Sequence, residues 1–324
     1  MADDRFQPVS GMELPRFAGV PTFMRLPNLT RQDELYSLTD IGFIGIPWDG
    51  GTTNRPGARH GPRQVRDYST MIRSTHPVSW VNPFELCNCA DLGDVSPNPS
   101  GLEDTLKRVE TFYKQVKADG ITPISVGGDH LTSLPVLRGL ADKGQPLSMI
   151  HFDAHTDLFA GYFGGTKYTH GTPFRCAIEE GLLDPKRVVQ IGIRGTMYDG
   201  EDIKWGRERG VTIIPIDECM ERGFKDVMAQ AHDIVGDTET YVSFDIDFID
   251  PAFAPGTGTP EIGGPDTWTA QQYVRELAGV KVVAADLVEV SPPFDQSGNT
   301  SWVAASILFE LLCIVAQARK GWEA

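Results

Sequence analysis

Acidic and imidazole side chains follow three apolar segments of this sequence at short, regular spacings. They are Asp129 and His130 after "ISVGG", Asp153, His155 and Asp157 after "MIHF", and Asp245 and Asp247 after "YVSF". Side chains two positions apart lie on the same face of a β-strand. The spacing therefore predicts that Asp153 and His155 share one strand face, and that Asp245 and Asp247 share another.

Such groups favour a metal centre if they converge. Carboxylates a few ångströms apart repel each other, and divalent cations relieve that repulsion. Four carboxylates and two imidazoles are too many ligands for one open catalytic ion, but they suit two ions about 3.5–4 Å apart with bridging carboxylates. Oxygen and imidazole ligands without thiolates favour Mn²⁺, with Co²⁺, Ni²⁺ or Zn²⁺ as alternatives. A single Asp is better explained as a helix cap, and a single His as a hydrogen-bonded polar residue. Three such segments together favour the metal centre.

Two further residues have side chains that suit catalysis or binding. His170 lies in the loop "YTHGTPFR", and Glu289 ends the apolar segment "DLVEV", where an acid would bind a cationic group. The alternatives are an ordinary loop histidine and a helix-capping or surface acid. Glycine-rich residues 50–62 and 255–264 lack both the GK[ST] sequence and the dinucleotide-binding spacing, so they exclude a nucleoside triphosphatase or a dehydrogenase of those types.

Short segments rich in Val and Ile alternate with helical patterns along the chain. The segments predicted to be strands are residues 41–47, 84–95, 121–128, 147–154, 187–195, 211–216, 240–247 and 280–290. Apolar residues at helical spacing predict helices at 101–120, 223–236 and 266–279. This alternation predicts a three-layer α/β/α fold with a mostly parallel sheet of about eight strands. Such sheets bind ligands beyond the carboxyl ends of their strands, where the acids and histidines fall.

The composition of the chain indicates which kinds of partner it can bind and which compartment it occupies. It has 324 residues and a formal net charge of −15, which disfavours a nucleic-acid partner. The N-terminus lacks a secretory pattern, and the apolar residues 302–318 contain Ser306 and Glu310, which predicts a buried helix and not a membrane span. Five scattered cysteines indicate reduced thiols, and hence a cytoplasmic protein. We expect one domain over residues 1–324, with residues 1–40 as an N-terminal extension packed on it.

The acidic segments together resemble the signature motifs of the ureohydrolase family, which includes arginase, agmatinase and related guanidino-acid hydrolases. These motifs read "GGDH", "DAHTD" and "SFDIDFIDPAFAPGTGTPEIGG". Three more segments resemble the bacterial guanidinopropionase and guanidinobutyrase branch, and they read "PRFAGVPTFMRLP", "GIPWDGGTTNRPGARHGPRQVR" and "THGTPFRCAIEEGLLDP". The resemblance covers nearly the whole chain after the N-terminus and implies an arginase-like fold.

The resemblance also implies a role for each candidate residue. Ligands of one manganese ion are matched by His130, Asp153, Asp157 and Asp245, and ligands of the other by His155, Asp153, Asp245 and Asp247. His170 matches the acid/base histidine of the family, and Glu289 matches the acid that holds the guanidinium. The implied reaction is hydrolysis of a small guanidino compound, such as 3-guanidinopropionate, to urea or a substituted urea and an amine. The implied assembly is a homotrimer or homohexamer.

The segment after "DAHTD" departs from the family pattern. Leu158 and Phe159 stand where the family commonly has a polar pair that receives a carboxylate tail, although Tyr162 still matches the guanidinopropionase-like pattern. An apolar wall favours an N-alkylated guanidine or a biguanide such as metformin, because it offers an anionic tail no hydrogen bonds. If Arg55 or Arg59 reaches the site, its positive charge would bind a carboxylate tail, and a guanidino acid would again be favoured.

Two alternatives lie outside ureohydrolase chemistry. A deacetylase-like hydrolase would share an α/β sheet but would hold one zinc ion and act on an acyl substrate. A non-catalytic subunit would instead assemble with an active paralogue, and the intact set of candidate ligands disfavours this reading.

Overall fold

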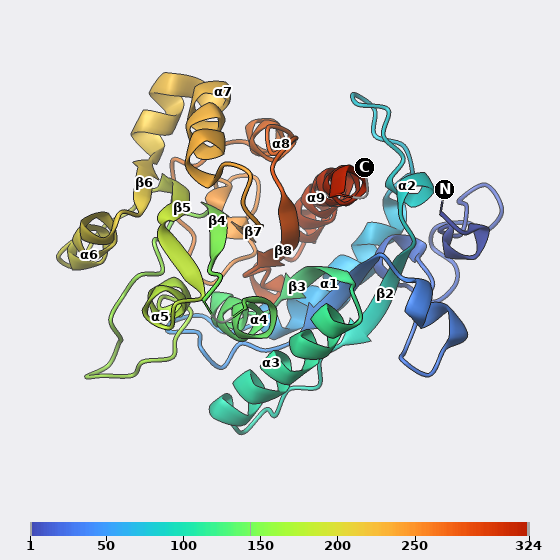
Figure 1. Cartoon of the computed structure of the whole chain (residues 1–324), viewed down its shortest axis with the longest axis horizontal. Coiled ribbons are helices and arrows are strands. Elements are labelled where there is room, and N and C mark those ends of the chain that lie inside the picture. Colours follow the sequence, from blue (N-terminus) through green and yellow to red (C-terminus); the bar gives the residue numbers. More distant parts are fainter. Residues whose placement is uncertain (1, 143, 323–324) are drawn as a thin grey trace.

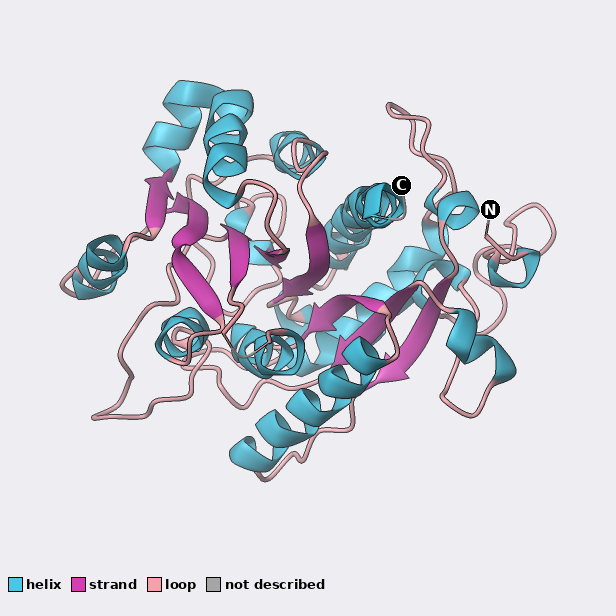
Figure 2. Cartoon of the chain, in the orientation of Figure 1, coloured by secondary structure: helices cyan, strands magenta, loops and turns pink. Residues whose placement is uncertain are grey.

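Eight strands form one parallel sheet in this computed structural model, in the order β2-β1-β3-β8-β7-β4-β5-β6 (Figure 1, Figure 2). The structure describes residues 2–142 and 144–322. The strands are β1 (Ile41–Ile46), β2 (Cys89–Asp94), β3 (Thr122–Gly127), β4 (Leu147–Phe152), β5 (Leu183–Ile193), β6 (Thr212–Pro215), β7 (Thr240–Asp245) and β8 (Val282–Val288). All pairings between neighbouring strands are parallel. The predicted fold class is confirmed.

Helices cover both faces of the sheet, which gives three layers (Figure 1). One face carries α1 (Gly61–Tyr68), α2 (Pro83–Leu86), α7 (Ile216–Val235), α8 (Thr267–Arg275) and α9 (Asn299–Trp322). The other carries α3 (Leu102–Ala118), α4 (Ser133–Leu140), α5 (Pro173–Glu179) and α6 (Glu201–Arg209). Each layer of helices packs on its own hydrophobic cluster, so the central strands are buried on both sides, as their nearly continuous apolar sequence predicts.

Two predicted elements differ from the observed ones for local reasons. Residues 84–95 do not form one strand, because Asn82 caps a short helix that begins at Pro83, and the strand starts only at Cys89. The helix predicted at 223–236 begins earlier, at Ile216, and contains Gly223 in a non-helical conformation with φ of 77°. Glycine tolerates this left-handed conformation, so one long element continues across the break.

The C-terminal helix α9 is longer than the apolar segment that predicted it. It has 24 residues, and by length and composition alone it would be able to cross a membrane. However, 72% of its most apolar window is buried inside the protein. Its apolar character is therefore explained by its position in the core beside β8, α1 and α8.

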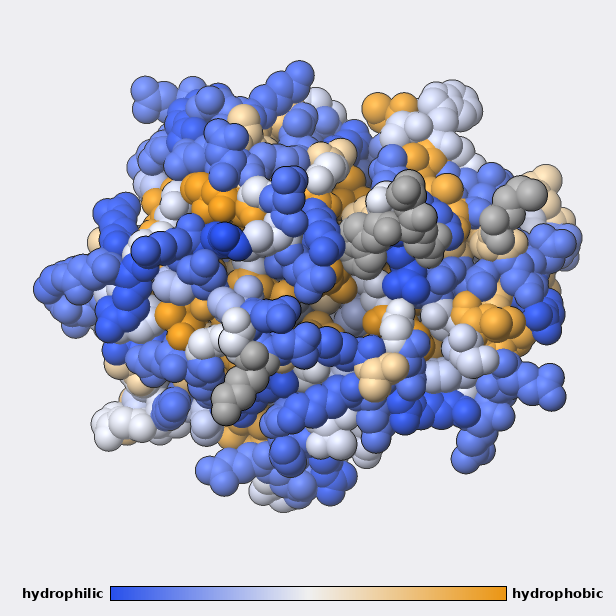
Figure 3. Space-filling model, in the orientation of Figure 1, coloured by the Kyte–Doolittle hydropathy of each residue, from blue (hydrophilic) through white to orange (hydrophobic). Residues whose placement is uncertain are grey.

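Residues 2–40 pack along the β2 edge of the sheet. The backbone N–H of Leu29 donates to the carbonyl of Asp91 at 2.9 Å, and the N–H of Asp91 donates to the carbonyl of Pro27 at 3.0 Å. The ring of Phe23 lies 5.4 Å from that of Phe43 in β1. These contacts join the N-terminal segment to β1 and β2. The outer surface in the same view is mostly hydrophilic, with small apolar areas between the polar side chains (Figure 3).

Candidate active site

The strand order brings the candidate segments together at one edge of the sheet. β3, β8, β7 and β4 are consecutive neighbours, so their carboxyl ends lie side by side. Asp245, the last residue of β7, pairs with Val288 of β8, and Asp153 directly follows the β4 residue that pairs with Phe244. Asp153, Asp245 and Glu289 therefore lie at nearly the same height on adjacent strands, at the edge where such folds bind ligands.

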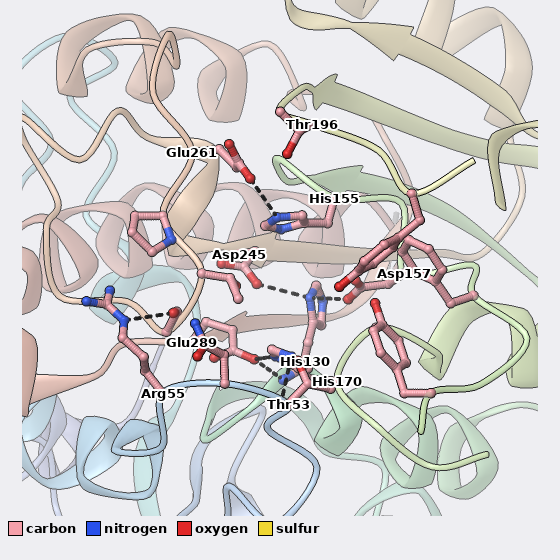
Figure 4. Close-up of a pocket in the computed structure, with 18 of the residues that line it drawn as sticks. Thr53, Arg55, His130, His155, Asp157, His170, Thr196, Asp245, Glu261 and Glu289 are labelled. Carbon is pink, nitrogen blue, oxygen red and sulfur yellow. Dashed lines mark hydrogen bonds and ion pairs between the residues drawn. The ribbon is translucent and has the colours of Figure 1, made fainter. Parts of the chain in front are cut away.

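A cavity of about 750 Å³ opens at these strand ends (Figure 4). The predicted site residues that line it are His130, His155, Asp157, Phe159, Tyr162, His170, Asp245 and Glu289. Asp153 and Asp247 are buried behind this lining, in contact with its histidines. The sequence thus identified most of the polar side chains that converge here.

The cause of this convergence differs from the predicted one. The shared strand face does not place His155 and Asp247, because β4 ends before Asp153 and β7 ends at Asp245. Instead, the carboxylate of Asp153 accepts a hydrogen bond from the backbone N–H of His155 at 2.6 Å, and Asp245 accepts one from Asp247 at 2.8 Å. Both are Asx turns, in which the side chain of an Asp folds the chain back two residues later.

Three carboxylates surround one nitrogen of His130. Its Nδ1 lies 3.1 Å from Oδ2 of Asp153, 2.9 Å from Oδ2 of Asp157 and 3.1 Å from Oδ2 of Asp245. This nitrogen is buried and has no hydrogen-bond partner. One imidazole nitrogen and three carboxylate oxygens facing one point are the donor set of a divalent cation.

A second group shares Asp153 with the first. Nδ1 of His155 lies 3.4 Å from Oδ1 of Asp153 and 3.1 Å from Oδ2 of Asp247. Asp153 thus turns one oxygen toward each histidine, which is the arrangement of a bridging carboxylate. The structure also places Glu261, which the sequence did not single out, 3.8 Å from Nε2 of His155.

The electrostatics of this cluster indicate a missing positive charge. Burial lowers the pKa of His130, but Asp157 and the carboxylates of Asp153 and Asp245 outweigh it and raise that pKa well above its usual value. Burial and Asp153 raise the pKa of Asp247 to about 6. Without a cation, protons must neutralise these buried carboxylates. The residues present therefore fit a metal centre.

Two of the predicted residues have a strained backbone. Asp157 has a φ of 54° and Glu289 has a φ of 63°, a left-handed conformation that is uncommon for residues other than glycine. Such strain persists only where the surroundings enforce it, and it is typical of functional sites. Here the two strained acids follow β4 and β8, and both line the cavity.

A buried hydrogen-bond shell orients the candidate ligands. His151 points Nε2 at Oδ2 of Asp153 at 2.8 Å, while its Nδ1 accepts from Gln190 at 3.0 Å. Nε2 of His130 lies 2.8 Å from Oγ of Ser243, so Nδ1 is left to face the carboxylates. Partners of this kind fix the tautomer and the angle of a ligand. The sequence interpretation missed His151, although it stands two residues before Asp153.

His170 and Glu289 come together on the opposite side of the cavity. Nδ1 of His170 is 2.9 Å from Oε1 of Glu289, and the same oxygen accepts the backbone N–H of His130 at 2.9 Å. Burial opposes protonation of His170, but Glu289 outweighs it and raises the pKa of the imidazole to about 9. Oε2 of Glu289 is buried and has no hydrogen-bond partner among the described residues. One carboxylate oxygen is therefore left for a cation in the cavity.

The residues predicted to contact the substrate tail do not all line the cavity. Phe159 and Tyr162 line the cavity, with ring centroids 5.2 Å apart. Leu158 does not: it is 0% exposed and belongs to the hydrophobic core. Leu158 packs so closely against α6 that a Cβ on Gly206 would lie 2.7 Å from its Cδ1. Its apolar side chain is therefore explained by the core and says nothing about the substrate.

Comparisons with known proteins agree with this geometry. Residues 39–313 match the arginase family. The chain is 55% identical to guanidinopropionase of Pseudomonas aeruginosa over 98% of both chains, and 45% identical to guanidinobutyrase of the same organism over 95% of this chain and 96% of the relative. The structure of proclavaminate amidino hydrolase from Streptomyces clavuligerus superposes with a TM-score of 0.88 at 39% identity, over 94% of this chain and 99% of that one. The chain belongs to the arginase family.

Proposed function

We propose that this protein hydrolyses a small guanidino compound of the 3-guanidinopropionate type to urea and an amine. One observation carries the proposal: the unpartnered Oε2 of Glu289 lies in the same cavity as the His130 and His155 groups. A guanidinium is planar and cationic and offers paired N–H donors, which match a carboxylate. Similarity to guanidinopropionase supports the same class of substrate.

Two divalent metal ions per chain fit the donor set, and we propose Mn²⁺, with Ni²⁺ or Co²⁺ as alternatives. His130, Asp153, Asp157 and Asp245 would hold one ion. His155, Asp153, Asp245 and Asp247 would hold the other, with Asp153 and Asp245 shared. Ions bound there would supply water activated for attack near neutral pH.

The side chains of the chain itself then orient the substrate and move protons. Glu289 holds the guanidinium with its carbon toward the metal side of the cavity. Oxygen from water adds to that carbon, and the bond from the carbon to the substituted nitrogen breaks. The leaving amine needs a proton, and His170 stands beside Glu289 to donate it. His170 recovers a proton from solvent before the next turnover.

Replacing His170 tests the proton step. His170→Asn should keep the metal content and the fold, because the ring contacts Glu289 and a loop and is not part of the two groups around His130 and His155. We expect kcat to fall by about 10²–10⁴-fold, the usual contribution of general acid/base catalysis. Steady-state kinetics with metal analysis checks this, and an unchanged kcat at full metal content would contradict it.

Among the described residues that line the cavity, Arg55 is the candidate partner of a carboxylate tail. Arg55 lines the cavity, and its guanidinium donates to the carbonyls of Gly258 at 3.0 Å and Thr257 at 2.7 Å without pairing with an acid. Arg59, the other basic residue considered, pairs with Asp49 and does not line the cavity. Arg55 therefore favours a guanidino acid over agmatine, whose tail is an ammonium group.

A second substrate class is favoured by one side of the same cavity. Phe159, Tyr162, Phe163 and Tyr198 form an aromatic wall in which neighbouring ring centroids are 5.2–6.1 Å apart. Aromatic faces attract alkylated cations, and their apolar surface also accepts the alkyl groups. An N-alkylated guanidine or a biguanide is therefore the second candidate.

A substrate panel tests the function and separates the two classes. We expect urea release by the purified chain, with kcat/KM for 3-guanidinopropionate exceeding that for agmatine by about tenfold or more, because Arg55 attracts one tail and repels the other. 4-Guanidinobutyrate, methylguanidine and dimethylbiguanide complete the panel. A preference for dimethylbiguanide would show that the aromatic wall decides specificity, and no turnover of any compound would contradict the proposed function.

The same experiment bears on assembly. Turnover by the single purified chain would exclude the alternative in which it is a non-catalytic subunit that assembles with an active paralogue. We propose a cytoplasmic homotrimer or homohexamer that acts without a nucleic-acid or membrane partner. Sedimentation analysis measures its mass.

A further inference from the structure

The loop before α1 holds the ring of His170 from the side opposite Glu289 (Figure 4). Oγ1 of Thr53 lies 2.8 Å from Nε2 of His170, and the backbone N–H of Thr53 donates to the same nitrogen at 3.2 Å. Nδ1 faces Glu289. Both ring nitrogens are thus engaged, and the orientation of the ring is fixed by contacts at its two ends.

These contacts also fix where the ring proton lies. A backbone N–H can only donate, so once His170 has given up its proton the nitrogen that faces Thr53 presents its lone pair. The proton of a neutral His170 then lies on Nδ1, directed at the carboxylate of Glu289. Thr53 therefore selects a tautomer as well as an orientation.

The loop is itself held by an acid that the metal groups do not use. Asp129 of the "GGDH" motif is fully buried, and its Oδ2 accepts the backbone N–H of Gly51 at 2.6 Å. The carbonyl of Gly51 in turn accepts the backbone N–H of His170 at 2.9 Å. A Cβ on Gly51 would lie 3.0 Å from that carboxylate oxygen and 2.9 Å from Cβ of Leu131, so glycine permits this close approach.

We propose that Thr53 is a positioning residue that keeps His170 beside the bound guanidinium. The inference rests on the proposed function. A guanidinium that binds Oε2 of Glu289 shares this carboxylate with His170, whose Nδ1 faces Oε1. The hydroxyl and the amide of Thr53 make the other hydrogen bonds of the ring among the described residues, and they hold the imidazole where the leaving amine needs its proton.

Kinetics of two variants in the same loop test the proposal. Thr53→Val keeps the shape and the amide but removes the hydroxyl, and we expect kcat to fall about tenfold with little change in KM. Thr53→Ser should restore kcat. Thr52→Val is the matched control, because the Thr52 hydroxyl lies 3.5 Å from Asp129 and not on His170. A kcat of Thr53→Val within twofold of wild type would overturn the proposal.

A double variant and a structure separate positioning from simple loss of structure. If Thr53 acts through His170, Thr53→Val should cost nothing further in the His170→Asn background, whereas a repeated tenfold loss there would overturn the proposal. Crystal structures of the metal-loaded wild type and Thr53→Val should show the ring displaced only in the variant. This readout does not need turnover, so an unmoved ring refutes the role of Thr53, while absence of urea release from wild type refutes the proposed function.

Discussion

Asp153→Ala and Asp245→Ala are each expected to lose both metal ions and nearly all turnover. Asp153 contacts the histidines of both groups through different oxygens, and Asp245 lies 3.1 Å from Nδ1 of His130 beside it. Removing a shared carboxylate takes one ligand from each ion and leaves the remaining buried acids without compensation. A ligand that served one ion alone would leave half of the metal in place.

Metal content measured by inductively coupled plasma mass spectrometry, with urea release in parallel, checks this expectation. Asp184→Ala is a suitable control, because it removes a partly exposed carboxylate of β5 that pairs only with Arg187 among the described residues. That variant should keep two ions per chain. Full metal content in Asp153→Ala or Asp245→Ala would contradict the assignment of that carboxylate as a ligand of both ions.

Glu289→Gln should lower kcat/KM by about 10²–10³-fold at unchanged metal content. The substitution is well matched to the site, because the amide oxygen of Gln can still accept from the backbone of His130 and from Nδ1 of His170. What it removes is the negative charge and the free acceptor Oε2. Losing one partner of a desolvated ion pair costs about 2–5 kcal/mol, which is roughly 30- to 5,000-fold in kcat/KM and brackets the expected loss.

The kinetic pattern distinguishes substrate binding from damage to the metal centre. Glu289→Gln should raise KM for every guanidino compound, and added metal should not rescue it. A variant with full metal content and kcat/KM within threefold of wild type would mean that another group holds the guanidinium. His170→Asn provides the contrast, since it is expected to act mainly on kcat.

Much of this site was predictable because its acids and histidines directly follow the apolar segments that form the central strands. Continuous apolar segments identified the central strands, and acids placed directly after them identified the edge where ligands bind. The sequence could not show that Asx turns, and not strand faces, place His155 and Asp247. Whether these residues lie in a turn or on a strand face depends on where each strand stops pairing with its neighbours.

Burial at the substrate pocket was the other feature that local sequence could not resolve. Leu158 and Phe159 are adjacent and both apolar, yet one belongs to the core and the other lines the cavity. Their different fates depend on α6, which lies about fifty residues further along the chain and supplies Gly206 as the partner of Leu158. Long-range packing of this kind leaves no signal within a short segment.

The pairing of residues 27–29 with Asp91 has a consequence for aggregation through the edge of the sheet. An open sheet ends in strands whose outer N–H and C=O groups are ready to bind any other strand, and such edges promote aggregation. On the β2 side, Leu29 and Pro27 already occupy the hydrogen-bonding groups of Asp91. Arg66 also pairs with the buried Asp91 carboxylate. The N-terminal segment thus blocks strand addition at this point and protects this edge of the sheet from pairing with another chain.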